Sequence, residues 1–279
     1  MLESFPGGEA GLRVGVFLAV LAVVAVIETM MPRRPLRAVK TQRWTTNFGL
    51  VVIDSIAVRL LVPLAAMGVA ALAAERGFGL LHWISVPSWL SFVIALVVLD
   101  FAIWLQHLVA HKVPILWRLH QVHHADVDFD VSTALRFHPI EILASMLWKM
   151  LVVAAIGAPV MAVLVFEVVL NAMAMFNHGN IRLPRALDAV LRLFVVTPDM
   201  HRVHHSVIRR ETDSNYGFNL SLWDRLFRTY RAQPKYGHDG MTIGLESYQD
   251  AGPSRLGWSL ILPFRATADD GKEVEHPAE

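Results

Sequence analysis

The chain has 279 residues, a net charge of +1, a hydrophobic fraction of 54% and a mean hydropathy of +0.45. This composition is too apolar for an ordinary soluble domain, and the near-neutral charge excludes a general attraction to nucleic acid. Cysteine is absent, which excludes disulfides, thiolate zinc sites and cysteine-ligated iron–sulfur clusters. Any metal must therefore be held by nitrogen and oxygen ligands, and the chain contains 13 histidines.

Long apolar segments predict several membrane-spanning helices. Residues 11–31 are almost wholly apolar, residues 48–74 form a second apolar stretch, and residues 77–99 contain no charged side chain. The third stretch is long enough to cross about 30 Å of hydrocarbon, and Pro87 is expected to begin its helix. Residues 142–181 are apolar on both sides of a Gly-Ala-Pro break, which predicts a helical hairpin.

Two opposite charges in this hairpin are expected to lie at similar depth. Lys149 lies eight residues before Gly157, and Glu167 lies eight residues after Pro159. An isolated charge inside a membrane is costly, so the two side chains are predicted to pair. The alternative is that each of them extends to a membrane interface instead.

The distribution of basic residues predicts the orientation. Residues 32–46 contain five lysines and arginines, whereas residues 75–88 contain one. The positive-inside rule then places the first loop, the segment 182–235 and every clustered histidine on the cytosolic side. No retention or transit signal separates a bacterial inner membrane from an organelle membrane, and the compact length favours the bacterial membrane.

Ten of the 13 histidines lie between residues 107 and 205. Eight of them form one HxxxH motif and two HxxHH motifs, in which residues three and four apart share a helix face, and His138 and His178 stand alone. Neutral imidazole is a good ligand for iron, zinc, copper and nickel, and ten histidines exceed what one octahedral ion can bind. The pattern therefore predicts two metal ions, with the following ligands: His107, His111, His120, His123, His124, His138, His178, His201, His204 and His205.

Ligand histidines need hydrogen-bond partners that fix their tautomer. Four polar residues near the motifs are predicted to fulfil this role, namely Asp100, Asp199, Asn177 and Asn180. No other catalytic residue is predicted beyond the metal centre. The remaining histidines, His82, His238 and His276, are expected to lie outside the site.

These motifs together resemble the fatty acid hydroxylase/sterol desaturase superfamily of membrane enzymes, over roughly residues 90–235. Leu108 and Trp104 differ from the residues that are common in the first motif of that superfamily, and Arg228 stands where glycine is frequent. The matching segments are Asp100 with His107-Leu-Val-Ala-His111, His120-Gln-Val-His123-His124, Arg136-Phe-His138-Pro-Ile-Glu141, Asn177-His178-Gly-Asn180, His201-Arg-Val-His204-His205, Asn215-Tyr216-Gly217 and Trp223-Asp224-Arg225-Leu226-Phe227.

The resemblance implies an all-α, multi-pass transmembrane bundle of about four to five membrane segments, including the hairpin, under a cytosolic helical cap that carries the histidines. It also implies two Fe2+ ions, O2 as co-substrate, a lipid substrate, and a separate electron donor of the cytochrome b5, ferredoxin or reductase type; zinc could replace iron in purified protein. Residues 1–89 are expected to form N-terminal transmembrane helices, residues 90–235 the catalytic domain, and residues 236–279 a C-terminal segment with a disordered polar tail.

The expected function is therefore oxygen-dependent hydroxylation or desaturation of a lipid. One alternative is a membrane electron carrier with bis-histidine haem, which needs histidines paired across helices deep in the bilayer. Another is a metal transporter, which needs ligands at several depths. A third is an inactive scaffold that keeps the fold, although the intact motifs argue against it.

Overall fold

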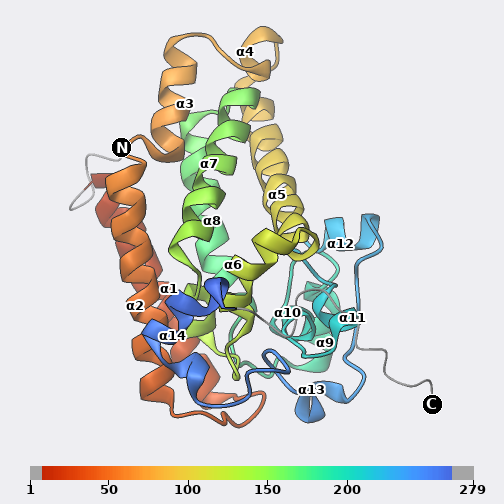
Figure 1. Cartoon of the computed structure of the whole chain (residues 1–279). Helices are drawn as coiled ribbons and strands as arrows, with labels where there is room; N and C mark the ends of the chain where they lie inside the picture. The colour runs from red at the N-terminus through yellow and green to blue at the C-terminus, as the bar shows by residue number, and fades with distance from the viewer. Residues whose placement is uncertain (1–7, 266–279) are drawn as a thin grey trace.

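The structure is a computed structural model that describes residues 8–265, and every regular element in this range is helical. Five segments are long and apolar enough to cross a membrane: α1 (Gly8–Met30), the segment Lys40–Trp83, α5 (Ser88–Lys112), α7 (Pro139–Ile156) and α8 (Val160–Asn177). They form an elongated bundle (Figure 1). The prediction of an all-α bundle with about four to five membrane segments is confirmed; the predicted disordered tail lies outside the described residues.

The second apolar stretch is divided into shorter helices. It comprises α2 (Lys40–Leu61), α3 (Ala65–Glu75) and the short α4 (Leu80–Trp83). Pro63 lies between α2 and α3, where its missing N–H and fixed φ prevent one continuous helix. His82 is part of α4, at the end of the molecule opposite the cap (Figure 1).

The predicted hairpin is present as α7 and α8, and α5 begins directly after Pro87 as predicted. Gly157 ends α7 in the left-handed region, with φ of +65°. A Cβ added there would lie 2.6 Å from the His82 side chain and 2.8 Å from the Phe78 carbonyl, so only glycine fits. The tight turn reverses the chain, and α7 and α8 both pack against α3 and α5.

The predicted ion pair in the hairpin is also present. Lys149 Nζ lies 2.7 Å from Glu167 Oε1. The other carboxylate oxygen of Glu167 lies 2.7 Å from an Arg13 Nη atom of α1, a partner that the hairpin alone could not indicate. Glu167 therefore ties α1, α7 and α8 together through two cations.

Replacing Lys149 by methionine should have a small effect, because Arg13 still neutralises Glu167. Replacing both Lys149 and Arg13 should destabilise the protein by about 3 kcal/mol or more, since an unpaired charge would remain buried. A double-mutant cycle of thermal unfolding in detergent is expected to show that the combined loss exceeds the sum of the single losses. Additive losses would contradict a shared role for the two cations.

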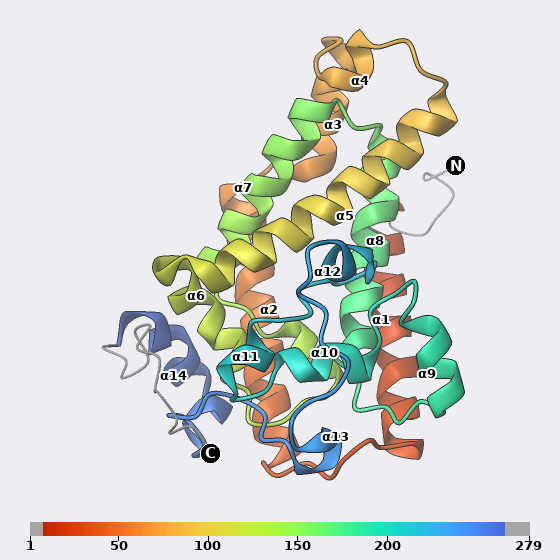
Figure 2. The ribbon, with the colours of Figure 1, turned by 90° about the vertical axis from the view of Figure 1, so that its right-hand side faces the viewer.

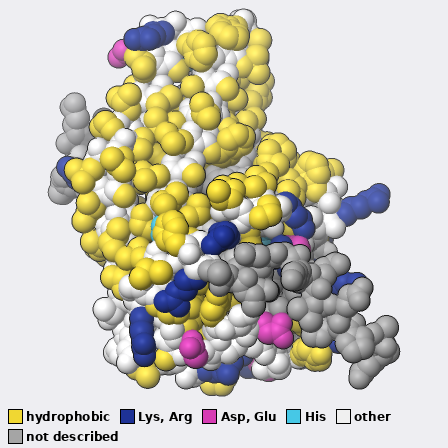
Figure 3. Space-filling view, viewed as in Figure 1, with side chains coloured by type: hydrophobic (Ala, Val, Ile, Leu, Met, Phe, Trp, Pro, Cys, Tyr) yellow, Lys and Arg dark blue, Asp and Glu magenta, His cyan; other side chains and the backbone are white. Residues whose placement is uncertain are grey.

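The remaining helices and the loops between them form a cap at one end of the bundle (Figure 2). The space-filling view in Figure 3 shows apolar side chains over the bundle and most of the basic ones around the cap. The cap helices are α6 (Pro114–His124), α9 (Arg185–Leu191), α10 (Pro198–His204), α11 (Arg209–Thr212), α12 (Leu222–Leu226), α13 (Gly237–Gly240) and α14 (Leu256–Ile261), with the 3-10 turns Val131–Leu135 (η2), Gly252–Ser254 (η3) and Leu262–Phe264 (η4).

The basic first loop lies at the cap end of the molecule. Arg33 Nε lies 3.3 Å from Asp199 in α10, and the backbone N–H of Arg37 donates to Asp128 at 2.9 Å. Arg43, at the start of α2, forms a buried ion pair with Asp126. The loop with the largest positive charge and the clustered histidines therefore share one end of the bundle.

Candidate metal centre

Four helices position the clustered histidines. α5 carries His107 and His111 at its last turns, and α6 carries the first HxxHH motif. α10 carries the second HxxHH motif, whose last residue, His205, is the C-cap. His178 is the C-cap of α8, so the hairpin returns the chain to the level of the other clustered histidines. All these histidines lie at the junction between the bundle and the cap.

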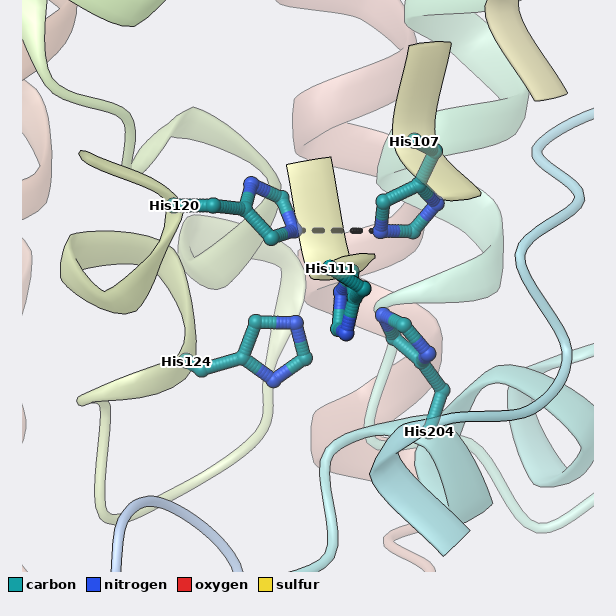
Figure 4. A group of neighbouring side chains, drawn as sticks. All are labelled: His107, His111, His120, His124 and His204. Carbon is teal, nitrogen blue, oxygen red and sulfur yellow. Dashed lines mark hydrogen bonds between the residues drawn. The ribbon is translucent and has the colours of Figure 1, made fainter. Parts of the chain in front are cut away.

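The structure divides nine of the ten predicted ligands into two groups. Within each group the ligand nitrogens lie within 4.8 Å of one another, and every member is buried. Figure 4 shows the rings of the five-histidine group turned towards a common space. The five-histidine group is His107, His111, His120, His124 and His204, and the four-histidine group is His123, His178, His201 and His205.

Each HxxHH motif contributes to both groups. The i, i+4 pair His120 and His124 stays together, whereas His123 belongs to the other group. Helix geometry explains the division, because a residue four positions on is rotated by about +40° and one three positions on by about −60°. The two groups are neighbours: the His124 and His205 ring centroids lie 4.6 Å apart. Two ions held here would lie side by side.

Hydrogen bonds to Nδ1 direct the other ring nitrogen into the five-histidine group. His107 Nδ1 bonds the Tyr216 carbonyl at 2.7 Å, and His120 Nδ1 bonds Glu141 Oε1 at 2.6 Å. Carbonyl and carboxylate oxygens only accept, so Nδ1 carries the proton in each ring and Nε2 carries a lone pair. These two Nε2 atoms nevertheless lie 3.0 Å apart. Two facing lone pairs repel each other unless a cation lies between them.

The four-histidine group repeats this arrangement. His123 Nδ1 bonds the Arg136 carbonyl at 3.1 Å, and His178 Nδ1 bonds the Ala174 carbonyl at 2.7 Å. Their Nε2 atoms lie 3.1 Å apart, and His201 Nε2 lies 3.1 Å from His178 Nε2. Two nitrogens that bind one ion at about 2.1 Å and at right angles are separated by about 3 Å. The separations in both groups therefore fit metal ligation.

Other ring nitrogens are buried without partners. Both ring nitrogens of His111, His124 and His205, together with His204 Nε2, are buried and make no hydrogen bond within the described part of the chain. Unsatisfied buried polar atoms are costly, and a bound cation would satisfy them. Burial lowers the pKa of His178 to about 4 and holds the pKa of His204 well below its usual value. Neutral imidazole is the form that binds metal.

The predicted acidic partners of the histidines bond elsewhere. The carboxylate of Asp100 accepts from Asn219 Nδ2 and Trp223 Nε1, both at 2.8 Å. Asp199 pairs with Arg202 and, at 3.3 Å, with Arg33. Neither carboxylate forms a hydrogen bond with a clustered histidine among the described residues. Asp100 fixes the segment around Asn219 and Trp223 against α5, and Asp199 fixes the basic first loop against α10.

The predicted amide partners act on the backbone. Asn177 Nδ2 donates to the Phe218 carbonyl at 2.9 Å, and Asn180 Nδ2 donates to the Arg34 carbonyl at 2.7 Å. These contacts hold the chain on both sides of His178. The two residues support the site through its loops, because their amides form no hydrogen bond with a histidine ring in the described structure.

His138 is the predicted ligand that the structure does not place in either group. It is the N-cap of α7, and its Nδ1 accepts from the Ile140 N–H at 3.2 Å. Its Nε2 bonds the Leu260 carbonyl at 3.2 Å. Both ring nitrogens are therefore satisfied by backbone groups, as expected for a capping residue.

Several partners of the histidines were missed in the sequence analysis. Four of these partners are backbone carbonyls, which no side-chain pattern in the sequence can indicate. They belong to Tyr216, Arg136, Ala174 and Ser214. Glu141 had such a signal, because it belongs to the Arg-Phe-His-Pro-Ile-Glu segment.

Replacing Glu141 by glutamine should weaken metal binding about 10- to 100-fold, the range typical of partners that orient a ligand histidine. Glutamine can still accept from His120 Nδ1 but loses the negative charge that makes the ring a better donor. Metal affinity, measured by competition with a chelator, provides the readout. The exposed carboxylate Glu246 provides the control: Glu246→Gln should retain wild-type affinity. Equal metal affinities for the wild type, Glu141→Gln and Glu246→Gln would contradict a role of Glu141 in orienting His120.

Two cavities flank the histidine groups. The smaller, of about 220 Å³, is lined largely by apolar side chains of α5, α6 and α7 and reaches Glu141. The larger, of about 470 Å³, runs along α2, and we call it the α2 cavity. Its wall includes Phe137, whose ring stacks on His123 with centroids 4.5 Å apart. Both cavities are large enough for part of a lipid, and each is lined by a residue that contacts a clustered histidine, Glu141 in the smaller and Phe137 in the larger.

The motifs, the helical bundle and the paired histidine groups define a class of membrane protein, and comparison with known proteins identifies the family. Residues 92–229 match the fatty acid hydroxylase family. The chain belongs to the fatty acid hydroxylase/sterol desaturase superfamily, as its motifs predicted.

Three relatives illustrate the range of this superfamily. The chain is 28% identical over 228 residues to an ornithine lipid hydroxylase of Rhizobium tropici, covering 79% of this chain and 67% of that protein. It is 31% identical over 174 residues to the alkylglycerol monooxygenase of Homo sapiens, covering 61% and 36% respectively. It is 26% identical over 187 residues to the cholesterol 25-hydroxylase of Rattus norvegicus, covering 62% and 61%.

The alignment thus spans about a third of the alkylglycerol monooxygenase. No solved structure matches the chain. The relatives are named as hydroxylases and monooxygenases, so the prediction of a superfamily of oxidoreductases is confirmed.

Proposed function

We propose that the chain is a membrane-bound, oxygen-dependent lipid hydroxylase that holds one iron ion in each histidine group. The observation that carries this proposal is the pair of adjacent groups of buried imidazole nitrogen donors. Five and four donors leave positions free on two octahedral ions, which suits ions that must also bind O2. Zinc would fit the same nitrogens in purified protein, and the superfamily favours iron.

Two iron ions bound in these groups would supply the activation of O2. The overall reaction consumes one C–H bond, one O2, two electrons and two protons, and it yields an alcohol and water. The residues of the chain hold the rings in fixed tautomers through their Nδ1 partners and bury the donors away from bulk water. The two electrons would come from a separate carrier of the cytochrome b5, ferredoxin or reductase type.

A lipid substrate is supported by the surroundings of the groups. Both cavities open among apolar side chains of helices that are long enough to span a membrane. The relatives act on an ornithine lipid, an alkylglycerol and cholesterol according to their names, so the names favour hydroxylation over desaturation but do not choose a lipid class. The basic first loop favours a cytosolic position of the groups, and a bacterial inner membrane remains our expectation.

The haem and transporter alternatives are less compatible with the geometry. Neighbouring rings within the groups have centroids as close as 4.4 Å for His178 and His201 and 4.5 Å for His107 and His204. A porphyrin plane does not fit between rings that close. A transporter needs ligands at several depths, whereas these donors lie at one level.

A comparison of lipid extracts tests this function. Cells that express the wild type should contain a lipid that is 16 Da heavier than a precursor, and growth under 18O2 should raise the difference to 18 Da. The product should be absent with His204→Ala. A product in which the label comes from water, or one that is 2 Da lighter than its precursor, would contradict hydroxylation by O2.

A further inference from the structure

The α2 cavity contains a charged residue that the metal centre does not use. Asp54, on α2, lines the cavity and is only 5% exposed. Its Oδ1 is buried and has no hydrogen-bond partner among the described residues. Burial favours the neutral form of such a carboxyl group, and a cation that enters the cavity would favour the ionised form instead.

No cation of the described structure forms an ion pair with Asp54. The charged group of the described chain that acts electrostatically on Asp54 is the carboxylate of Glu141, which is also negative. Arg59 lines the same cavity, but it is exposed and forms no ion pair with Asp54 in the described structure. Among the described residues no cation pairs with Asp54, so a cationic ligand in the cavity would stabilise the ionised form of its carboxyl group.

The same cavity reaches the four-histidine group. Phe137 lines it, and the Phe137 ring stacks on His123 with an interplanar angle of 6°. Apolar residues of α1, α2 and η2 line most of the remaining wall, including Phe17, Val58 and Leu135. A ligand in this cavity would contact a carboxylate and hydrocarbon at once, and one aromatic ring would separate it from a predicted metal ligand.

We propose that Asp54 binds the ammonium group of a lipid headgroup, so that the substrate class is an amine-bearing membrane lipid. An ammonium group pairs with the ionised carboxylate and donates a hydrogen bond to it, whereas a neutral headgroup provides only the hydrogen bond. The headgroup end of the lipid then lies beside Phe137. This inference rests on the proposed function for its lipid substrate, but the binding site can be tested without turnover.

Binding of two simple probes to protein in phosphatidylcholine nanodiscs tests the site. Dodecylamine is charged at neutral pH, and dodecanol is its neutral counterpart. Asp54→Asn, which keeps the size of the side chain, should weaken dodecylamine binding at least about 10-fold, the scale of a charge-assisted hydrogen bond. Dodecanol binding should change less than about twofold, and Asp54→Glu should restore part of the dodecylamine affinity.

Arg59 provides the matched control, because Arg59→Gln removes the opposite charge from the same cavity. This variant should bind dodecylamine as tightly as the wild type or more tightly. Unchanged dodecylamine binding by Asp54→Asn would overturn the inference. An equal loss in Arg59→Gln would also overturn it, since the loss would then reflect general damage to the cavity. Metal content equal to that of the wild type verifies that each variant is folded.

Turnover separates this inference from the proposed function. With O2 and a reductant, an amine-bearing lipid should yield a product 16 Da heavier, and Asp54→Asn should lower its kcat/KM at least about 10-fold. Asp54-dependent dodecylamine binding without oxidation of any lipid would refute the proposed function and retain the site. Oxidation of the amine-bearing lipid at the same rate by Asp54→Asn would refute the site and retain the function.

Discussion

Replacing His124 by alanine should lower the metal content from about two ions per chain to about one and abolish lipid oxidation. His124 belongs to the five-histidine group, and both of its ring nitrogens are buried without a partner in the described structure. The loss of activity should exceed 100-fold, which is about the upper limit for residues that only orient a ligand. Metal analysis of the purified variant by mass spectrometry gives the readout.

Two other histidines make this prediction specific. His123→Ala should also leave about one ion, because the adjacent residue serves the other group. His138→Asn should retain both ions and most of the activity, because asparagine can replace histidine as the N-cap of α7. Loss of metal from His138→Asn, together with full metal content in His124→Ala, would contradict the assignment of the two groups.

Replacing Arg43 by methionine should destabilise the protein by about 3–5 kcal/mol. Arg43 is 1% exposed, and its guanidinium lies 2.7 Å from both Asp126 and Asp130. Burial opposes ionisation of Asp126, but Arg43 lowers the pKa of Asp126 to about 2. Without the cation, two carboxylates would remain buried close to one another. The loop after His124 would lose its ion pairs with α2.

Thermal unfolding in detergent measures this effect. Arg37→Met is the matched control, because the Arg37 side chain is exposed and its contact with Asp128 is made by the backbone N–H. The control should change stability by less than about 0.5 kcal/mol. Adding Asp126→Asn and Asp130→Asn to Arg43→Met should recover part of the loss. A stable Arg43→Met protein would show that the ion pair does not hold the cap to the bundle.

The sequence predicted the parts of the fold that depend on local pattern. Apolar length identified the membrane helices, Pro87 the start of α5 and Gly157 the hairpin turn, because each depends on backbone chemistry near one residue. The spacing of the histidines likewise predicted which of them share a helix face. The pairing of Lys149 with Glu167 followed from their equal depth in a hairpin. The contact of Arg13 with Glu167 could not be predicted, because it depends on how α1 packs against α8.

The composition of the site depended on contacts that local pattern does not carry. Helical spacing accounts for the division of His123 from His124, but which histidines of α5, α8 and α10 join each of them depends on how these helices pack. The carbonyl partners of the rings have no side-chain signature, whereas the carboxylates and amides near the motifs are visible in the sequence but bond other groups. His138 lies at the same end of the bundle as the ligand histidines because it caps α7 there, and sequence alone does not distinguish this capping role from ligation.

The iron content of the wild-type protein tests the central claim most directly. Protein purified from cells grown with iron, and analysed for metal and for its absorption spectrum, is expected to contain about two irons per chain and no haem band. A content of about one iron per chain, or a haem spectrum, would contradict two ions held by the five-histidine and four-histidine groups.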